Sequence, residues 1–448
     1  MNIILHYLLP FLVAIVLLVL VHELGHFLVA RWCGVKVLRF SIGFGKPFWT
    51  TRRGEDQTEW ALAPIPLGGY VKMLDEREGE VAPEELHRAF NRQPVGKRIL
   101  IVAAGPLINF LFAVVLFWGM FVHGVYEPPA TLAAPAEGSA AAIAGVKEGE
   151  HVQKIDGIAV ESWSDLRWRF LSHAIDADQV TLEVRTPEDE ILERHIETQT
   201  ARATGWQGDP MQSLGLMLQL PKIRPIVGAV LPKSAAEEGG LRIGDEILAI
   251  EGVKIDSWET LARTVGHSPG VPLLFDVQRD SATLAIRVTP QVENHEGVEI
   301  GRIGVEVLNK RPRIAYGPVD AARRALLETW ELSALSLKML GKMVIGEVST
   351  KNLSGPITIA NYAGKSAQMG WEPYLRLLAL ISVSLGIFNL LPIPILDGGL
   401  LLYYFAEIIK RGPISKRGEE IGQQIGMAFL LTLMIFVFYN DINRFFFD

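Results

Sequence analysis

The segment LLVLVHELGHFLVARW, residues 17–32, carries two histidines and a glutamate inside an otherwise apolar run. Residues 1–21 contain no Asp, Glu, Lys or Arg, and three further blocks share this composition: 99–125, 377–396 and 421–440. Each block is about as long as the roughly 20 apolar residues that span a bilayer. The sequence therefore predicts an α-helical membrane protein with four transmembrane helices, and it excludes an ordinary soluble enzyme.

Charge predicts how these spans are oriented. The formal net charge of -7 disfavours a nucleic-acid partner. Residues 31–98 hold 12 Lys/Arg against 9 Asp/Glu, whereas residues 125–372 hold 25 against 34. The positive-inside rule then places 31–98 and 406–420 in the cytoplasm, and 126–371 and both termini outside. Because the first block lacks a basic leader, we interpret it as a retained span and not as a signal peptide. The one cysteine, Cys33, excludes an intrachain disulfide.

These signals predict the order of the parts. They are a first span (1–32), a cytoplasmic segment (33–97), a second span (98–125), two outer domains (126–221 and 222–310), an outer amphipathic region (311–372), a third span (373–405), a cytoplasmic loop (406–420), a fourth span (421–440) and an outer tail (441–448). Residues 318–345 are expected to form a helix that packs on the membrane surface or against the outer domains. Leu353-Ser354-Gly355-Pro356 is expected to end that unit.

The outer region contains an internal repeat. Ser139-Ala140-Ala141 recurs as Ser234-Ala235-Ala236, and Ser162-Trp163 recurs as Ser257-Trp258, each at an offset of 95 residues. A constant offset across several positions indicates two copies of one domain. The pattern resembles PDZ domains of the bacterial protease type, which implies two tandem α/β domains.

Each copy ends in a short segment with a central glycine, which we predict to be a strand. The two segments are Leu214-Gly215-Leu216 and Ile303-Gly304-Val305. In PDZ domains such a segment offers backbone N–H groups to the C-terminal carboxylate of a peptide, and a neighbouring strand edge pairs with that peptide. The segment follows the repeat core here, which suggests a circularly permuted order. Periplasmic peptides or proteins are therefore candidate partners.

His22-Glu23-Leu24-Gly25-His26 has the pattern HExxH. On a helix, residues i and i+4 share a face, so both imidazoles can bind one metal ion while Glu23 reaches a metal-bound water as general base. A carboxylate inside a membrane helix costs ~2.5–3.5 kcal/mol and therefore needs a partner. The alternative is a structural His/Glu cluster near a helix end. The apolar setting favours a zinc site.

A catalytic zinc ion needs a third protein ligand. Asp397 is the candidate, because two prolines and two glycines break the helix around it and allow the backbone to turn its carboxylate toward the metal. These residues are Pro392, Pro394, Gly398 and Gly399. The alternative for Asp397 is an interfacial aspartate that caps a helix.

Two further segments carry structural predictions. The apolar runs on either side of Gly68-Gly69, within residues 61–73, predict a β-hairpin. It either dips back toward the membrane or lies on the surface. In the second span, Gly105-Pro106 is expected to loosen the helix, and Asn109 is expected to bond to a neighbouring helix.

Together, HExxH, Gly105-Pro106 with Asn109, and Asn389 with Asp397 resemble the site-2 protease family of intramembrane zinc metalloproteases. PLGGYVKM (66–73), the two repeats, NLSGPI (352–357) and LLPIPILDGG extend the match, in order, to a Gram-negative bacterial branch of that family. The resemblance covers essentially the whole chain. Many relatives have His where this chain has Leu400, which lies beyond the ligand motif.

The resemblance implies roles for individual residues. His22, His26 and Asp397 would bind one zinc ion, and Glu23 would be the catalytic base. The substrate would be held as an added strand on the hairpin and positioned by an asparagine beside the helix break. The implied substrate-binding residues are Asn389, Gly68, Gly69, Tyr70, Pro392 and Pro394.

The resemblance also implies a function and a location. The substrates would be single-span membrane proteins in the bacterial inner membrane, such as an anti-sigma factor already cleaved on its periplasmic side, or remnant signal peptides. Cleavage would release a cytoplasmic fragment in envelope stress signalling, and the PDZ pair would act as a size filter or as a reader of the new C-terminus. One alternative is a membrane-tethered PDZ scaffold with a vestigial metal site. Another is a transporter, which four spans without an inverted repeat disfavour.

Overall fold

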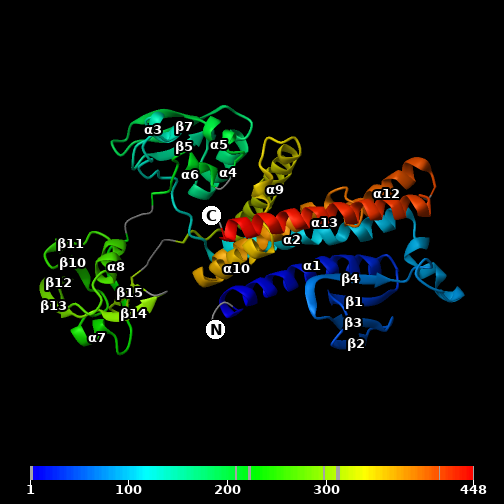
Figure 1. Cartoon of the computed structure of the whole chain (residues 1–448), viewed down its shortest axis with the longest axis horizontal. Coiled ribbons are helices and arrows are strands. Elements are labelled where there is room, and N and C mark those ends of the chain that lie inside the picture. Colours follow the sequence, from blue (N-terminus) through cyan, green and yellow to red (C-terminus); the bar gives the residue numbers. More distant parts are fainter. Residues whose placement is uncertain are drawn as a thin grey trace. The chain divides into compact units, whose positions relative to one another are not determined.

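The computed structural model describes residues 4–206, 209–219, 223–295, 298–308, 313–412 and 414–446. The predicted boundaries at 221/222 and 310/311, the start of the first span and the end of the tail lie outside these residues. The chain forms two compact units (Figure 1). One comprises Met1–Met217 with Ile314–Asp448, and the other Leu218–Arg313. The second unit nearly coincides with the second predicted outer domain, whereas the first outer domain belongs to the unit that contains the spans.

Four helices in the described part of the chain are long and apolar enough to cross a membrane. They are α1 (Leu9–Trp32), which follows a π-helical turn at Ile4–Leu8, α2 (Val95–His123), α11 (Trp371–Leu390) and α13 (Lys416–Phe446). This confirms the four predicted transmembrane helices. The fourth is longer than predicted, because α13 continues through the described part of the region taken as an outer tail.

The predicted third span, 373–405, is two helices. α11 ends at Leu390 and α12 (Asp397–Lys410) begins at the candidate ligand itself. Pro392 and Pro394 explain the break, since proline lacks the N–H that a helix interior needs. Because α12 extends to Lys410 and α13 starts at Lys416, the connection between them is shorter than the predicted loop 406–420.

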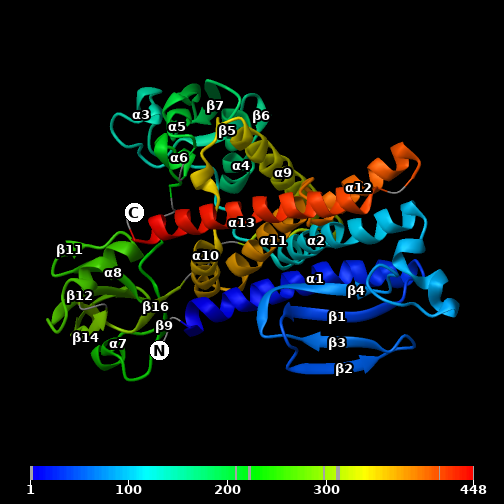
Figure 2. The ribbon, with the colours of Figure 1, turned by 45° about the vertical axis from the view of Figure 1, so that its right-hand side comes forward.

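Between α1 and α2 the chain forms a four-stranded sheet. Its strands are β1 (Val37–Phe44), β2 (Trp49–Arg53), β3 (Thr58–Leu62) and β4 (Ile65–Met73), in the order β2-β3-β1-β4. Figures 1 and 2 show α1 and α2 side by side, with β4 as the strand nearest to α1. The 3-10 turns Pro83–Arg88 and Phe90–Arg92 lead from the sheet into α2.

The predicted hairpin turn at Gly68-Gly69 is wrong. Both glycines lie inside β4, where Gly69 pairs with Ile42 and Tyr70 with Ser41 of β1 in antiparallel register. Pairing to β1 keeps the apolar run extended, and the chain instead turns at Ala63-Pro64, before β4 begins. β4 is an edge strand, so one of its two backbone edges has no partner strand within the described sheet.

The two repeats form sheets with the same strand order. The first repeat domain contains α3 (Ala140–Ile143), β5 (His151–Ile155), β6 (Ile158–Ala159), α4 (Trp163–Ala174), β7 (Gln179–Arg185), β8 (Ile191–Glu197), α5 (Gln199–Ala203) and α6 (Pro210–Ser213), with sheet order β6-β5-β7-β8. The second contains β9 (Val227–Val230), α7 (Ala235–Gly239), β10 (Glu246–Ile250), β11 (Val253–Lys254), α8 (Trp258–Gly266), β12 (Leu273–Arg279), β13 (Ala282–Val288), β14 (Gln291–His295), β15 (Val298–Arg302) and β16 (Val305–Val307), with order β11-β10-β12-β13.

The recurring sequence motifs have equivalent structural roles in the two repeats. Ser162 caps α4 by accepting from the Asp165 N–H, and Ser257 caps α8 by accepting from the Thr260 N–H. The carboxylates at the equivalent positions 150 and 245 are both buried and paired with an arginine. Glu150 lies 2.5 Å from Arg194, and Asp245 lies 2.7 Å from Arg279. Each ion pair therefore links two segments of its own repeat domain.

The glycine-centred segments that close the repeats are not the predicted strands. Leu214 and Gly215 form a turn after α6, where the Gly215 N–H donates to Gln212 and the Leu216 N–H to Met211. In the second repeat only Val305 of Ile303-Gly304-Val305 is in a strand. Both glycines have positive φ, +83° at Gly215 and +72° at Gly304, which a regular strand does not adopt. Both also lie close to the capping serine of the short helix: a Cβ on Gly215 would lie 2.2 Å from Ser139 Oγ, and one on Gly304 would lie 2.3 Å from Ser234 Cβ.

The predicted amphipathic helix is α9 (Pro318–Val344). Its buried residues, among them Ala321 and Ala325, share a core with side chains of α2 and α11. Its polar side contacts the first repeat domain, where Lys342 lies 2.9 Å from Asp176 and Arg324 lies 2.6 Å from Glu161. Of the two packing modes expected, α9 therefore packs against an outer domain, and it also covers the ends of two spans.

A second helix in this region was not predicted. α10 (Pro356–Met369) starts at the segment expected to end the unit, after a 3-10 turn at Thr350–Asn352. Asp441, near the end of α13, supplies the missing N-terminal cap. Its carboxylate is 2% exposed and accepts from the backbone N–H groups of Gly355, Ile357 and Thr358 at 2.8–3.2 Å and from Thr358 Oγ1 at 2.7 Å. This contact joins the last span to α10.

Replacing Asp441 with alanine should therefore destabilise the protein. Hydrogen bonds to a buried charged group contribute about 1.5–3 kcal/mol, and their donors would be left without an acceptor. We expect a lower thermal unfolding midpoint in detergent and faster proteolysis between α9 and α10. Glu420→Ala removes an exposed carboxylate from the same helix and is the matched control. Equal midpoints for the two variants would contradict the capping role.

Candidate metal centre

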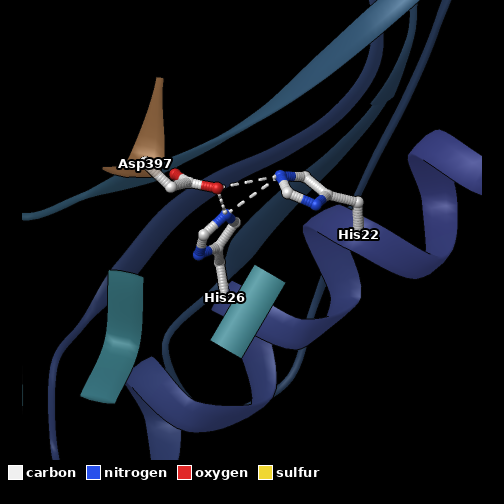
Figure 3. Close-up of side chains that lie close together, drawn as sticks. All are labelled: His22, His26 and Asp397. Atoms are coloured by element: carbon white, nitrogen blue, oxygen red, sulfur yellow. Dashed lines mark hydrogen bonds and ion pairs between the residues drawn. The ribbon is translucent and has the colours of Figure 1, made fainter. Parts of the chain in front are cut away.

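α1 and α12 bring three potential metal ligands together (Figure 3). His22 Nε2 lies 3.3 Å from Asp397 Oδ2, His26 Nε2 lies 3.5 Å from the same oxygen, and the two Nε2 atoms are 3.3 Å apart. In the described part of the chain, this is the only group of three or more His, Cys, Asp or Glu side chains that could hold one metal ion. The two histidines predicted from their i, i+4 spacing and the distant aspartate thus form one site.

The spacing of these three atoms fits zinc. Ligands about 2.0–2.1 Å from a tetrahedral zinc ion lie about 3.3–3.4 Å from one another. The observed separations of 3.3, 3.3 and 3.5 Å are close to that value. Asp397 Oδ2 is buried without a hydrogen-bond partner among the described residues, although it faces both imidazoles. A cation at this point would satisfy all three atoms.

α2 supplies the groups that orient the imidazoles. His26 Nδ1 lies 2.9 Å from the carbonyl oxygen of Ile101. Because a carbonyl oxygen can only accept a hydrogen bond, Nδ1 carries the proton and donates it, which leaves Nε2 free for a metal. His22 Nδ1 lies 3.1 Å from Nδ2 of the Asn109 side chain. The other amide atom, Asn109 Oδ1, is buried without a hydrogen-bond partner among the described residues. An amide rotated by 180° would accept from the Nδ1–H of His22 and free that Nε2 as well.

The close approach of α2 to the site depends on Gly105. A Cβ at this position would lie 2.2 Å from His26 Nε2 and 2.8 Å from His22 Cε1. Gly25 of α1 plays the reciprocal part, since its Cβ would lie 2.5 Å from the carbonyl oxygen of Ala104. The prediction that Gly105-Pro106 loosens the helix stays a prediction, since α2 runs unbroken through Pro106, which lies inside the helix. The glycine allows two helix backbones and two imidazoles to share a small space.

The metal ligands line a cavity of about 440 Å³. Glu23, Asn389, Gly69 and Tyr70, all predicted from sequence, also line it. Glu23 is 8% exposed, and a Cβ on Gly69 would lie 2.9 Å from its Cγ, so β4 passes directly beside the candidate base. The unpaired edge strand, the metal ligands and the end of α11 therefore share one space.

Other predicted residues lie elsewhere. Pro392 and Pro394 are in the link between α11 and α12 but not among the residues that line the cavity, and Gly68 packs against the ring of Phe44. Ile395, in the same link, has φ of +99°, which a β-branched residue rarely adopts. Leu214-Gly215-Leu216 and Ile303-Gly304-Val305 belong to the repeat domains.

Some functional groups were missed by the sequence analysis. The carbonyl of Ile101 carries no signal, because any residue has one. Lys72, Asp75, Arg77 and Tyr404 also line the cavity. The alternation of side chains along β4 could have indicated Lys72, which lies two residues beyond Tyr70.

The profile of peptidase family M50 matches residues 10–433. The chain belongs to this family. It is 41% identical to Protease RseP of Yersinia pestis over 444 residues, which are 97% of this chain and 98% of the relative. It is 40% identical to Regulator of sigma-E protease RseP of Escherichia coli over 440 residues, with the same shares of 97% and 98%. A Ralstonia nicotianae protein named as a zinc metalloprotease is 41% identical over 456 residues, 98% of each chain.

A PDZ domain of an SdrC-like protein from Listeria monocytogenes covers 20% of this chain and 94% of its own, at 15% identity and a TM-score of 0.18, which is too low to support a shared fold. Family membership and the four apolar helices make the protein an intramembrane zinc metalloprotease of the site-2 type.

Gly105→Ala should lower the zinc affinity by about 10–100-fold, as loss of support around metal-binding histidines does. Alanine favours a helix by about 1 kcal/mol over glycine, so a loss can only come from the collision with the imidazoles. Gly119→Ala is the matched control, because a Cβ there meets no described atom within 4 Å. Zinc content and affinity of the purified proteins are the measurement. Equal zinc affinities would contradict the close-approach role.

Proposed function

We propose that His22, His26 and Asp397 hold the catalytic zinc ion, and that the protease hydrolyses peptide bonds in the transmembrane segments of single-span membrane proteins. The triangle of ligand atoms carries this proposal, because its spacing fits one zinc ion and it lies between apolar helices. The substrate class includes an anti-sigma factor already cleaved outside the membrane and remnant signal peptides. The name of the Escherichia coli relative, a regulator of sigma-E protease, supports the former.

The catalytic step is assigned to Glu23. A zinc ion in this site supplies Lewis-acid polarisation of the scissile carbonyl and makes water a stronger acid. The Glu23 carboxylate accepts a proton from the attacking water and returns it to the amine of the departing peptide. Its place beside the ligands on α1, next to β4, puts it within the cavity that a substrate carbonyl must enter. The low exposure of Glu23 keeps bulk water from competing for that proton.

The open edge of β4 is assigned to substrate binding. A transmembrane helix hides its carbonyl groups in its own hydrogen bonds, so it must become extended before attack. Backbone groups along Gly69, Tyr70 and Val71 can replace those bonds, because β4 has a partner strand on one side only. Asn389, in the last turn of α11, faces the same cavity and can bond to the exposed substrate backbone. Pro392 and Pro394 would act indirectly, by ending α11 beside it.

The location of the parts is also a proposal. The basic residues of 31–98 favour a cytoplasmic position for the sheet, with the active site near that face of the inner membrane and both termini on the periplasmic side. The repeat domains would be tandem PDZ-like domains in the periplasm that exclude large substrates or read new C-termini. The N–H groups of Gly215 and Leu216 already have acceptors, which favours the second repeat as the peptide reader.

The other interpretations have less support. A scaffold with a vestigial metal site would not need three ligand atoms at zinc spacing with a glutamate beside them. A transporter would need a membrane path for ions, whereas the described His and Asp side chains bring three ligand atoms together at one metal position. Membership of peptidase family M50 favours the protease over both the scaffold and the transporter.

Glu23→Gln should lower the rate of cleavage of a tagged single-span substrate by about 10²–10⁴-fold and leave the zinc content unchanged. The amide keeps the size of the side chain but cannot accept the proton. Glu328→Gln is the control, because the carboxyl of Glu328 is 20% exposed, pairs with Arg376 and does not line the cavity of the metal ligands. Cleavage by Glu23→Gln at the wild-type rate would refute the assignment of the base.

Strand addition predicts a pattern of crosslinks. In a Cys33→Ser, Glu23→Gln, Lys72→Cys protein, single cysteines placed along the substrate near its cleavage site should form disulfides at every second position. A substrate bound as a helix would instead crosslink at every third or fourth position. Thr51→Cys on β2, at the opposite edge of the sheet, replaces Lys72→Cys in the control protein and should give none. A helical pattern would contradict the proposed role of β4.

A further inference from the structure

A second cavity, of about 520 Å³, lies between α1 and the sheet and takes no part in the metal centre. α1 contributes Leu20, Phe27 and Arg31 to its lining. The sheet contributes Phe40, Ile42, Trp49, Thr51, Arg53, Gly54, Thr58, Trp60, Ala61 and Leu62. Hereafter this space is called the α1–sheet groove. It shares no lining residue with the cavity of the metal ligands.

The floor of the groove is aromatic and apolar. The rings of Phe27, Phe40 and Trp60 contact one another, with centroids 4.7–5.6 Å apart. Register in the sheet sets Trp49 opposite Leu62 and Thr51 opposite Trp60. Alternate residues of β2 therefore extend the same apolar surface toward the outer edge of the sheet.

The groove has one apolar end and one cationic end. Along α1 the lining runs from Leu20 to Arg31, and along β2 it runs from Trp49 to Arg53, so each element is apolar at one end and cationic at the other. Leu20 and Arg31 are separated by about 16 Å along the axis of α1 at 1.5 Å per residue. Since α1 is a membrane helix that ends at Trp32, the apolar end lies at membrane depth and the cationic end at the membrane surface.

The two guanidinium groups lie at the same end, and neither forms a direct salt bridge with a carboxylate among the described residues, although Arg31 Cζ lies 5.9 Å from the centroid of the Phe27 ring. A Cβ on Gly54, next to Arg53, would lie 3.6 Å from Arg31 Nη1. The carboxylate in the adjacent turn, Asp56, binds both terminal nitrogens of Arg88 at 2.7 and 2.8 Å. The hydrogen bonds from Arg88 are the largest cause that holds the pKa of Asp56 below its ordinary value, and the charge of Arg31 adds a smaller contribution, so the hydrogen-bonding capacity of Asp56 is directed mainly at Arg88.

We propose that the α1–sheet groove binds one anionic phospholipid, with an acyl chain along the aromatic floor and the phosphate between Arg31 and Arg53. The ligand must be amphipathic, because the groove is apolar at depth and doubly cationic at the surface. The inference rests on the cytoplasmic position proposed for the sheet, where anionic lipids give the membrane a negative surface potential.

The test uses the full-length protein in detergent, titrated with phosphatidylglycerol or phosphatidylcholine and examined by native mass spectrometry. Each arginine near an anionic headgroup contributes about fivefold in affinity, so the double variant Arg31→Gln, Arg53→Gln should bind phosphatidylglycerol about 25-fold more weakly. Arg52→Gln is the matched control, because Arg52 is exposed on β2 one residue away and its side chain points to the other face. Its affinity should equal that of the wild type.

A photoreactive acyl chain on the same lipid should label peptides that contain Leu20, Phe27 or Trp60. Equal losses in Arg52→Gln and in the double variant, equal affinity for phosphatidylcholine, displacement by millimolar inorganic phosphate alone, or labelling only at other helices would each overturn the proposal. Zinc content reports whether the variants fold. Glu23→Gln should retain lipid binding without cleavage, so a failed protease assignment and a failed lipid site give different results.

Discussion

The structure depends on placing two imidazoles and two carboxylates among apolar helices. Such groups are costly in a membrane unless they face one another or a metal ion. His22, Glu23 and His26 enter on α1, and Asp397 enters at the first residue of α12. The residues next to the site are therefore small or supply a backbone acceptor. Gly105 and Gly69 leave room for the side chains of the site, and the carbonyl oxygen of Ile101 accepts a hydrogen bond from His26.

Catalysis inside a membrane also requires irregular backbone close to the metal, which is tolerated only where protein covers it. Two elements meet this need in different ways. The link between α11 and α12 leads directly into Asp397. Gly398 and Gly399 pack against backbone carbonyl groups of residues 390–393. The sheet brings an edge strand beside the base while β1 satisfies the other side of that strand. In the remaining parts of the same unit, α9 covers α2 and α11, and Asp441 of the last helix caps α10.

Sequence reasoning succeeded where one local pattern determined one structure. Long apolar blocks fixed the four helices, the i, i+4 histidines fixed one face of α1, and the 95-residue offset matched two sheets of the same strand order. It failed where a partner distant in the sequence decided the outcome. Gly68-Gly69 has the composition of a turn, but pairing with β1 keeps it extended. The glycine-centred segments that close the repeats have the composition of strands, but Gly215 and Gly304 have positive φ beside the capping serines, so the chain leaves the extended conformation there.

The sequence alone determined the number of spans, the chemistry of the ligands and the family resemblance, because hydrophobic length and side-chain type are local properties. Only the tertiary structure decided that Asp397 reaches the two histidines at zinc spacing, that α2 orients both imidazoles, and that β4 exposes its free edge beside Glu23. It also decided that α1 and the sheet enclose a separate groove with an apolar end and a cationic end. Distances between elements remote in sequence depend on how closely backbones pack, and a few glycines without side chains set that limit.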